Sequence, residues 1–121
     1  AGCGHERPLV YRAADRRVER LETGGLVLGV VPDLGPYIEE VRVALAPGDQ
    51  VLFYTDGVEL GFQSKGDDSF DTQMYRSVFR ELAGAPIEEM LSEIVRRLDN
   101  ETGSLDPKDD VTIVGMEVTS A

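Results

Sequence analysis

Acidic residues stand at the ends of two apolar segments of the sequence. Asp56 comes directly after "VLFYT", residues 51–55, whereas Asp109 and Asp110 come directly before "VTIVGMEV", residues 111–118. Both segments have the length and apolar character of β-strands. If the two strands are antiparallel neighbours, the end of one and the start of the other lie at the same edge of a sheet. We therefore predict that these carboxylates converge there.

Carboxylates held close together repel one another, and this raises their pKa values unless a cation neutralises them. Oxygen ligands of this kind suit hard divalent ions such as Mg²⁺ or Mn²⁺. The pattern also fits a simpler interpretation, in which Asp56 and Gly57 form a solvated turn and "PKDD", residues 107–110, is a polar loop. The residues alone leave both interpretations open.

His5 and Cys3 lie close together in "CGHE". A ligand or acid–base role for the single histidine competes with that of a turn residue hydrogen-bonded to backbone, which we favour. No histidine and acid are placed to activate Cys3, so we expect a small buried residue and not a nucleophile. Because a lone cysteine forms no internal disulfide, we expect a reduced, cytoplasmic setting.

The composition argues against several functional classes. A chain of 121 residues, 41% of them hydrophobic, suffices for one domain or part of one. The net charge of −11 argues against a general binder of nucleic acids or anionic membranes, because both need a basic surface. The longest apolar run, Leu26–Val31, is interrupted by Gly29 and is too short to span a bilayer, so we expect no membrane insertion.

The first part of the sequence has the patterns of strands and loops. Residues 8–13 and 18–22 predict a hairpin around a polar turn. Residues 24–37 are rich in glycine and proline and predict a loop, and we expect its apolar stretch Leu26–Val31 to point inward.

A second pair of strands is predicted on either side of "APGD". Apolar residues alternate with others over 41–45, which is the period of a half-buried strand. "APGD", residues 46–49, predicts a tight turn, because proline fixes φ and glycine tolerates a positive φ. We therefore expect residues 50–55 to run antiparallel to 41–45.

Two helices and a final strand complete the pattern. Met74, Val78 and Leu82 have four-residue spacing, and Gly84 follows as a stop. Pro86–Asn100 has acidic residues early and basic residues late, as helices favour. Its apolar stripe, which we expect to be core, comprises Ile87, Met90, Leu91, Ile94, Val95 and Leu98. The order of strands, two helices and a strand predicts an α+β fold with antiparallel sheets flanked by helices.

Four motifs occur in an order that resembles the C-terminal portion of SpoIIE-type phosphatases: "CGHERPLVYR", "GGLVLGVVPD", "LAPGDQVLFYTDGVEL" and "DPKDDVTIVGMEV". These are bacterial metal-dependent (PPM-like) protein serine/threonine phosphatases, and the resemblance covers residues 1–121 as one domain or part of one. It implies a sandwich of antiparallel sheets flanked by helices, incomplete here at its N-terminal end. It also implies a two-metal centre holding Mn²⁺ or Mg²⁺, whose water attacks the phosphorus of phosphoserine or phosphothreonine.

The resemblance assigns site residues one by one. Asp56 in "TDG" and Asp109 in "DDVT" match metal-binding aspartates, and Asp110 ranks below Asp109 because relatives carry Asp or Asn there. Gly57 is expected to let the backbone turn sharply beside the metal, although a plain turn glycine fits equally. Glu59 is one position early for the family pattern and receives no role. No catalytic residue beyond the metal ligands is expected.

One departure concerns activity. The bridging aspartate of the family lies in an upstream "D..GHG" motif, which this chain does not contain. We therefore expect a fragment that is inactive alone. We also expect its unpaired strand edges, residues 8–13 or 51–55, to favour a homodimer.

Three functions remain as hypotheses. The first is a phosphatase whose substrate, implied by the family, is a phosphorylated anti-sigma-factor antagonist. The second is a non-catalytic, phosphatase-like module that binds a regulatory partner through its acidic surface. The third, a calcium site at "KGDDSFD", residues 65–71, lacks the alternating acids and terminal glutamate of an EF-hand and is the weakest.

Overall fold

The computed structural model describes residues 2–62, 77–102 and 110–120. Its strands are β1 (Leu9–Arg12), β2 (Arg17–Arg20), β3 (Gln50–Tyr54) and β4 (Ile113–Glu117). Its helices are α1 (Asp56–Phe62), α2 (Phe79–Leu82) and α3 (Ile87–Thr102), and a 3₁₀ turn, η1, spans Gly35–Tyr37. The expected α+β class is confirmed, and within these ranges no helix is long and apolar enough to cross a membrane.

The four strands form one antiparallel sheet in the order β2-β1-β3-β4. The predicted hairpin of β1 and β2 is confirmed, with Leu9 opposite Arg20. On its other side β1 pairs with β3, and β3 pairs with β4 with Tyr54 opposite Ile113. The edges of the sheet are therefore β2 and β4. Our expectation of an exposed edge at residues 8–13 or 51–55 is wrong, because β1 and β3 are the two interior strands.

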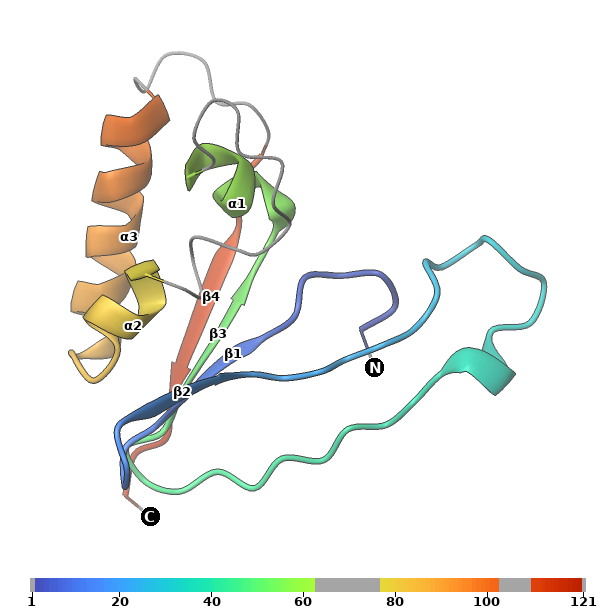
Figure 1. The fold of residues 1–121 in the computed structure, drawn as a ribbon, viewed down its shortest axis with the longest axis horizontal. Helices are drawn as coiled ribbons and strands as arrows, with labels where there is room; N and C mark the ends of the chain where they lie inside the picture. The colour runs from blue at the N-terminus through green and yellow to red at the C-terminus, as the bar shows by residue number, and fades with distance from the viewer. Residues whose placement is uncertain (1, 63–76, 103–109, 121) are drawn as a thin grey trace.

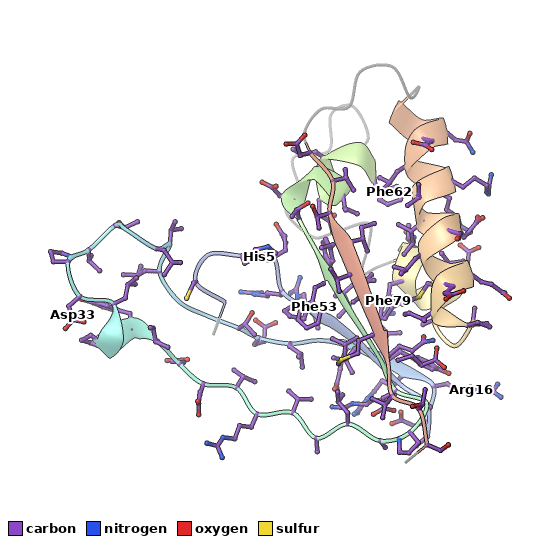
Figure 2. All side chains as sticks on the ribbon, turned by 180° about the vertical axis from the view of Figure 1, so that it is seen from behind. His5, Arg16, Asp33, Phe53, Phe62 and Phe79 are labelled. Atoms are coloured by element: carbon purple, nitrogen blue, oxygen red, sulfur yellow. The ribbon has the colours of Figure 1, made fainter. Side chains whose placement is uncertain are left out.

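The core lies between one face of this sheet and the helices (Figure 1). Leu9, Leu52 and Tyr54 of the sheet are buried against helical side chains. The fully or nearly fully buried helical residues are Val58, Val78, Phe79, Met90, Ile94 and Leu98. The opposite face of β3 and β4 carries apolar side chains that stay about half exposed, namely Phe53 (labelled in Figure 2), Val114 and Met116.

Helix α3 confirms the predicted helix. The residues that face the core differ slightly from the predicted apolar stripe. Met90, Ile94 and Leu98 face the core, whereas Leu91 is half-buried and Val95 is 49% exposed. Leu91 packs over Gly115 of β4, where a Cβ would lie 3.2 Å from the Leu91 Cδ1 atom. Of the other predicted helix, Val78 and Leu82 lie at α2 and Gly84 ends it with a φ of 92°, whereas Met74 lies outside the described residues.

The connection between β2 and β3 differs most from the expectation. Residues 41–45 form no strand, and their predicted pairing with 50–55 is wrong because both edges of β3 are occupied, by β1 and β4. Leu26–Val31 does not point inward either, since Leu28 and Val30 are 68% and 65% exposed. Figure 1 shows this connection running away from the sheet before it returns at the "APGD" turn. That turn is confirmed by the hydrogen bond from Asp49 N–H to Ala46 O, 3.0 Å.

Candidate functional site

The end of β3 and the start of β4 meet, as the sequence predicts. Beyond the last ladder pair, Thr55 N–H donates to Thr112 O at 3.0 Å. Asp56 follows Thr55 and is the first residue of α1, a helix that the sequence analysis did not predict. Asp110 lies two residues before Thr112, and both aspartates are exposed. The structure therefore places Asp56 and Asp110 at the same end of the sheet.

The residues on either side of Asp56 both contact the carbonyl oxygen of Asp110. The Thr55 hydroxyl donates to that oxygen at 3.3 Å and accepts from Thr112 N–H at 3.0 Å. A Cβ added at Gly57 would overlap the same Asp110 oxygen. Sequence reasoning missed Thr55, although the polar Thr at the end of an apolar strand, directly before the acid, was an available signal.

Gly57 packs closely against a second backbone segment. It is buried in the first turn of α1 and has no positive φ, so any residue could adopt its backbone conformation. The space for a side chain is missing because the 110–112 backbone lies against it. Gly57 lies within the turn closed by the bond from Val58 N–H to Thr55 O, 3.1 Å, and the approach of a second backbone segment gives a separate reason for glycine.

The carboxylate oxygens at this edge are the type of ligand that binds hard divalent cations. Asp56 and Asp110 supply carboxylate oxygens, the ligands that Mg²⁺ and Mn²⁺ prefer. Within residues 2–62, 77–102 and 110–120, no group of three or more His, Cys, Asp or Glu side chains could hold a metal ion. Asp109, the other predicted ligand, lies outside the described residues, as does the "KGDDSFD" segment. Among the described residues, this edge therefore has two exposed carboxylates of a suitable type.

The opposite end of β3 holds a buried carboxylate that the sequence analysis treated only as a turn residue. Asp49 accepts from Ala46 N–H and Ala13 N–H, each at 3.0 Å, and from the Arg12 guanidinium at 3.1 Å. The backbone hydrogen bonds from Ala46 and Ala13, and then Arg12, hold the pKa of Asp49 below its ordinary value. Asp49 therefore ties the "APGD" turn to the β1–β2 hairpin, and its partners are structural.

Gln50, also buried, joins the sheet to the α2–α3 junction. Its side-chain amide accepts from Gly84 N–H at 3.0 Å and donates to Ala85 O at 2.7 Å. Glu117, opposite Gln50 on β4, accepts from Ile87 N–H at 3.1 Å at the start of α3. These bonds fix where α3 begins on the sheet.

His5 and Cys3 belong to a turn near the start of the chain. His5 N–H donates to Gly2 O at 2.8 Å, and the His5 ring lies 3.3 Å from the Glu6 carbonyl oxygen through Nδ1. The expectation of a turn histidine hydrogen-bonded to backbone is confirmed. Cys3 is a free thiol, half-buried and not fully buried as expected, with a φ of 47°.

Comparison with known families decides the relationship. Residues 1–119 match the family described as Stage II sporulation protein E (SpoIIE). The chain belongs to the SpoIIE family. A comparison with curated protein sequences found no match.

Solved structures share the fold. The phosphatase domain of SpoIIE from Bacillus subtilis, presoaked with Mn, superposes with a TM-score of 0.69 at 19% identity over 98% of this chain. The SiaA-PP2C domain of Pseudomonas aeruginosa gives a TM-score of 0.66 at 20% identity over 92% of this chain. The RsbU and RsbW domains of Rv1364c from Mycobacterium tuberculosis give 0.69 at 26% identity over 97%.

The matched region is only part of each of these relatives. The chain spans 49% of the first, 42% of the second and 31% of the third. The chain therefore corresponds to about half of the first relative's length and to less of the other two.

Proposed function

We propose that this chain is the C-terminal portion of a metal-dependent protein serine/threonine phosphatase. The observation that carries the proposal is the meeting of Asp56 and Asp110 at one end of the sheet, in a chain that belongs to the SpoIIE family. The likeness to the Mn-presoaked SpoIIE phosphatase domain supports the same assignment.

In this proposal Asp56 and Asp109 are metal ligands, and Asp110 is a secondary one. When bound, Mn²⁺ or Mg²⁺ supplies activation of a water that attacks the phosphorus, without a phosphoenzyme intermediate. The chain itself contributes the carboxylates and the strand end that positions them. His5 and Cys3 take no part.

The proposed substrate is the phosphoserine or phosphothreonine of an anti-sigma-factor antagonist. The substrate class rests on the family resemblance, and the matched Rv1364c structure combines RsbU and RsbW domains in one protein. The net charge of −11 disfavours nucleic acid as a partner. We place the protein in the cytoplasm, in keeping with the free thiol of Cys3.

The 121 residues alone are proposed to have no more than trace activity, because the bridging-aspartate motif of the family is not among them. We further propose that the isolated chain forms homodimers through the edges of β2 or β4, since bare strand edges pair readily. Light scattering at micromolar concentration tests the dimer, and a monomer throughout would refute it.

The deciding experiment uses a protein that carries this chain together with the rest of the phosphatase domain. Asp56→Asn should remove most Mn²⁺-dependent hydrolysis of a phosphoserine peptide. Asp99→Asn, the same substitution at an exposed position of α3, is the matched control and should leave activity unchanged. Equal activity of the two variants at saturating Mn²⁺ would refute the metal site and favour the non-catalytic, phosphatase-like module.

A further inference from the structure

We propose that Thr55 is a positioning residue that holds the two acidic segments of this edge in register through its hydroxyl group. The inference rests on the proposed metal-binding role of Asp56. Thr55 itself does not bind the metal in this proposal, because its hydroxyl group contacts the neighbouring chain segment.

Thr55 makes three hydrogen bonds to the backbone of residues 110–112. Its backbone N–H bonds to Thr112 O, which already extends the β3–β4 ladder by one residue. Its hydroxyl then accepts from Thr112 N–H at 3.0 Å and donates to Asp110 O at 3.3 Å. One side chain therefore fixes the backbone on both sides of residue 111, beyond the point where β4 begins at Ile113.

Thr55 links the two acidic residues of this edge. Thr55 is covalently bonded to Asp56, and its hydroxyl is hydrogen-bonded to the carbonyl of Asp110. Gly57 contacts the same carbonyl from the other side of Asp56. Thr55 and Gly57, the two neighbours of Asp56, therefore both contact the backbone of Asp110. A change of the Thr55 hydroxyl would move the two carboxylates relative to one another, although neither is altered.

Thr55 also directly precedes the first residue of α1. The carbonyl of Thr55 accepts from Val58 N–H at 3.1 Å, an i→i+3 bond that closes the turn from β3 into α1. A threonine hydroxyl at such a position commonly accepts from an N–H of its own helix. Here it accepts from Thr112, so the side chain joins two segments instead of serving α1 alone. Partners that orient metal ligands in this way affect metal affinity without touching the ion.

The test compares Thr55→Val, which keeps the shape and removes the hydroxyl, with Thr55→Ser, which keeps the hydroxyl. In the 121-residue chain, Thr55→Val should speed hydrogen exchange at the Thr112 amide about tenfold, the effect of one lost hydrogen bond. Exchange at the β4 amides 113–117 should stay within about twofold, since the ladder there is intact. Thr55→Ser should restore the wild-type rate.

Titration with Mn²⁺ alone provides the second measurement. Thr55→Val should weaken Mn²⁺ binding by about 10- to 100-fold, as loss of an orienting partner does, while Thr55→Ser binds like the wild type. Unchanged Thr112 exchange in Thr55→Val, or equal behaviour of the Val and Ser variants, would overturn the inference. Equal acceleration at Thr112 and throughout β4 would also overturn it, because the hydroxyl would then only stabilise the sheet.

The same data separate this inference from the proposed function. Asp56→Asn should abolish Mn²⁺ binding while leaving Thr112 exchange at the wild-type rate. A wild-type chain that binds no Mn²⁺ would refute the metal role of Asp56 in this chain, and the exchange rates would then decide the role of Thr55 by themselves.

Discussion

The two ends of β3 each carry an aspartate, and the two aspartates are held in opposite ways. At the start, the Asp49 side chain is only 4% exposed and bonds to two backbone N–H groups and to Arg12. At the finish, Asp56 is exposed, and the bonds around it are made by its neighbours Thr55 and Gly57 to the Asp110 segment.

Under the proposed function, the two ends of one strand serve different purposes. A buried carboxylate with its hydrogen bonds satisfied stabilises the fold, and little capacity is left for a ligand. An exposed carboxylate beside a second acidic segment adds little to stability and remains available to a cation. The structural role of the Asp49 end and the proposed metal-binding role of the Asp56 end can therefore be separated by mutation.

The largest expected effect comes from the core that both ends share. Ile94→Ala should lower the free energy of unfolding by about 2–5 kcal/mol, because Ile94 is completely buried beneath the sheet. Leu91→Ala should cost less, since Leu91 is only half-buried. Urea unfolding of the two variants tests this ranking. Equal losses would mean that α3 packs as the sequence stripe predicts, with Leu91 in the core.

Gly57→Ala, at the Asp56 end, should have the next largest effect on stability. The added methyl group would overlap the Asp110 carbonyl, and such overpacking typically costs about 1–3 kcal/mol. Gly24→Ala is the matched control and should be close to wild type in stability, because a Cβ added at Gly24 meets no atom within 4 Å and Gly24 has no positive φ. Thermal unfolding in which Gly57→Ala is as stable as wild type would refute the close approach.

Asp49→Asn should destabilise the chain by about 1–3 kcal/mol, since a buried charge-assisted set of hydrogen bonds is weakened. The depressed pKa of Asp49 gives stability that is present above the ordinary aspartate pKa of about 3.9 and is lost as the pH falls below it. The variant should therefore lose less stability than wild type between about pH 4 and pH 2. Parallel acid-unfolding curves would contradict the assignment.

Asp56→Asn should have the smallest effect on stability, within about 0.5 kcal/mol in metal-free buffer, as expected of an exposed site. The change should be neutral or slightly stabilising, because one of two neighbouring negative charges is removed. A loss as large as that of Asp49→Asn, measured by urea unfolding, would show that the two ends of β3 do not differ.

Local patterns in the sequence predicted the elements whose interactions involve residues close together in the chain. The β1–β2 hairpin, the "APGD" turn and α3 are all confirmed. The alternating residues 41–45 have the same apolar period but form no strand, since pairing depends on a free edge and β3 has none. Alternation predicts that a segment can pair and does not supply the partner.

The candidate site was predictable in part, for the same reason. The meeting of the two acidic segments was predicted on the condition that the two strands are antiparallel neighbours, and the pairing of β3 with β4 fulfils that condition. The contacts that bring them together, from Thr55 and Gly57 to Asp110, depend on the close approach of segments more than 50 residues apart, which no local pattern encodes. The buried setting of Asp49 likewise depends on Ala13 and Arg12, from a different hairpin.

The central claim is that the Asp56 end of the sheet binds a divalent cation, and Mn²⁺ provides the most direct test because it broadens nearby NMR signals. In ¹H–¹⁵N spectra of the chain, substoichiometric Mn²⁺ should broaden the amides of residues 55–58 and 110–112 first. Amides near Asp49, at the other end of β3, should stay sharp, and Asp56→Asn should remove the selective broadening. Broadening that is uniform over the acidic surface, or that persists unchanged in Asp56→Asn, would contradict the account.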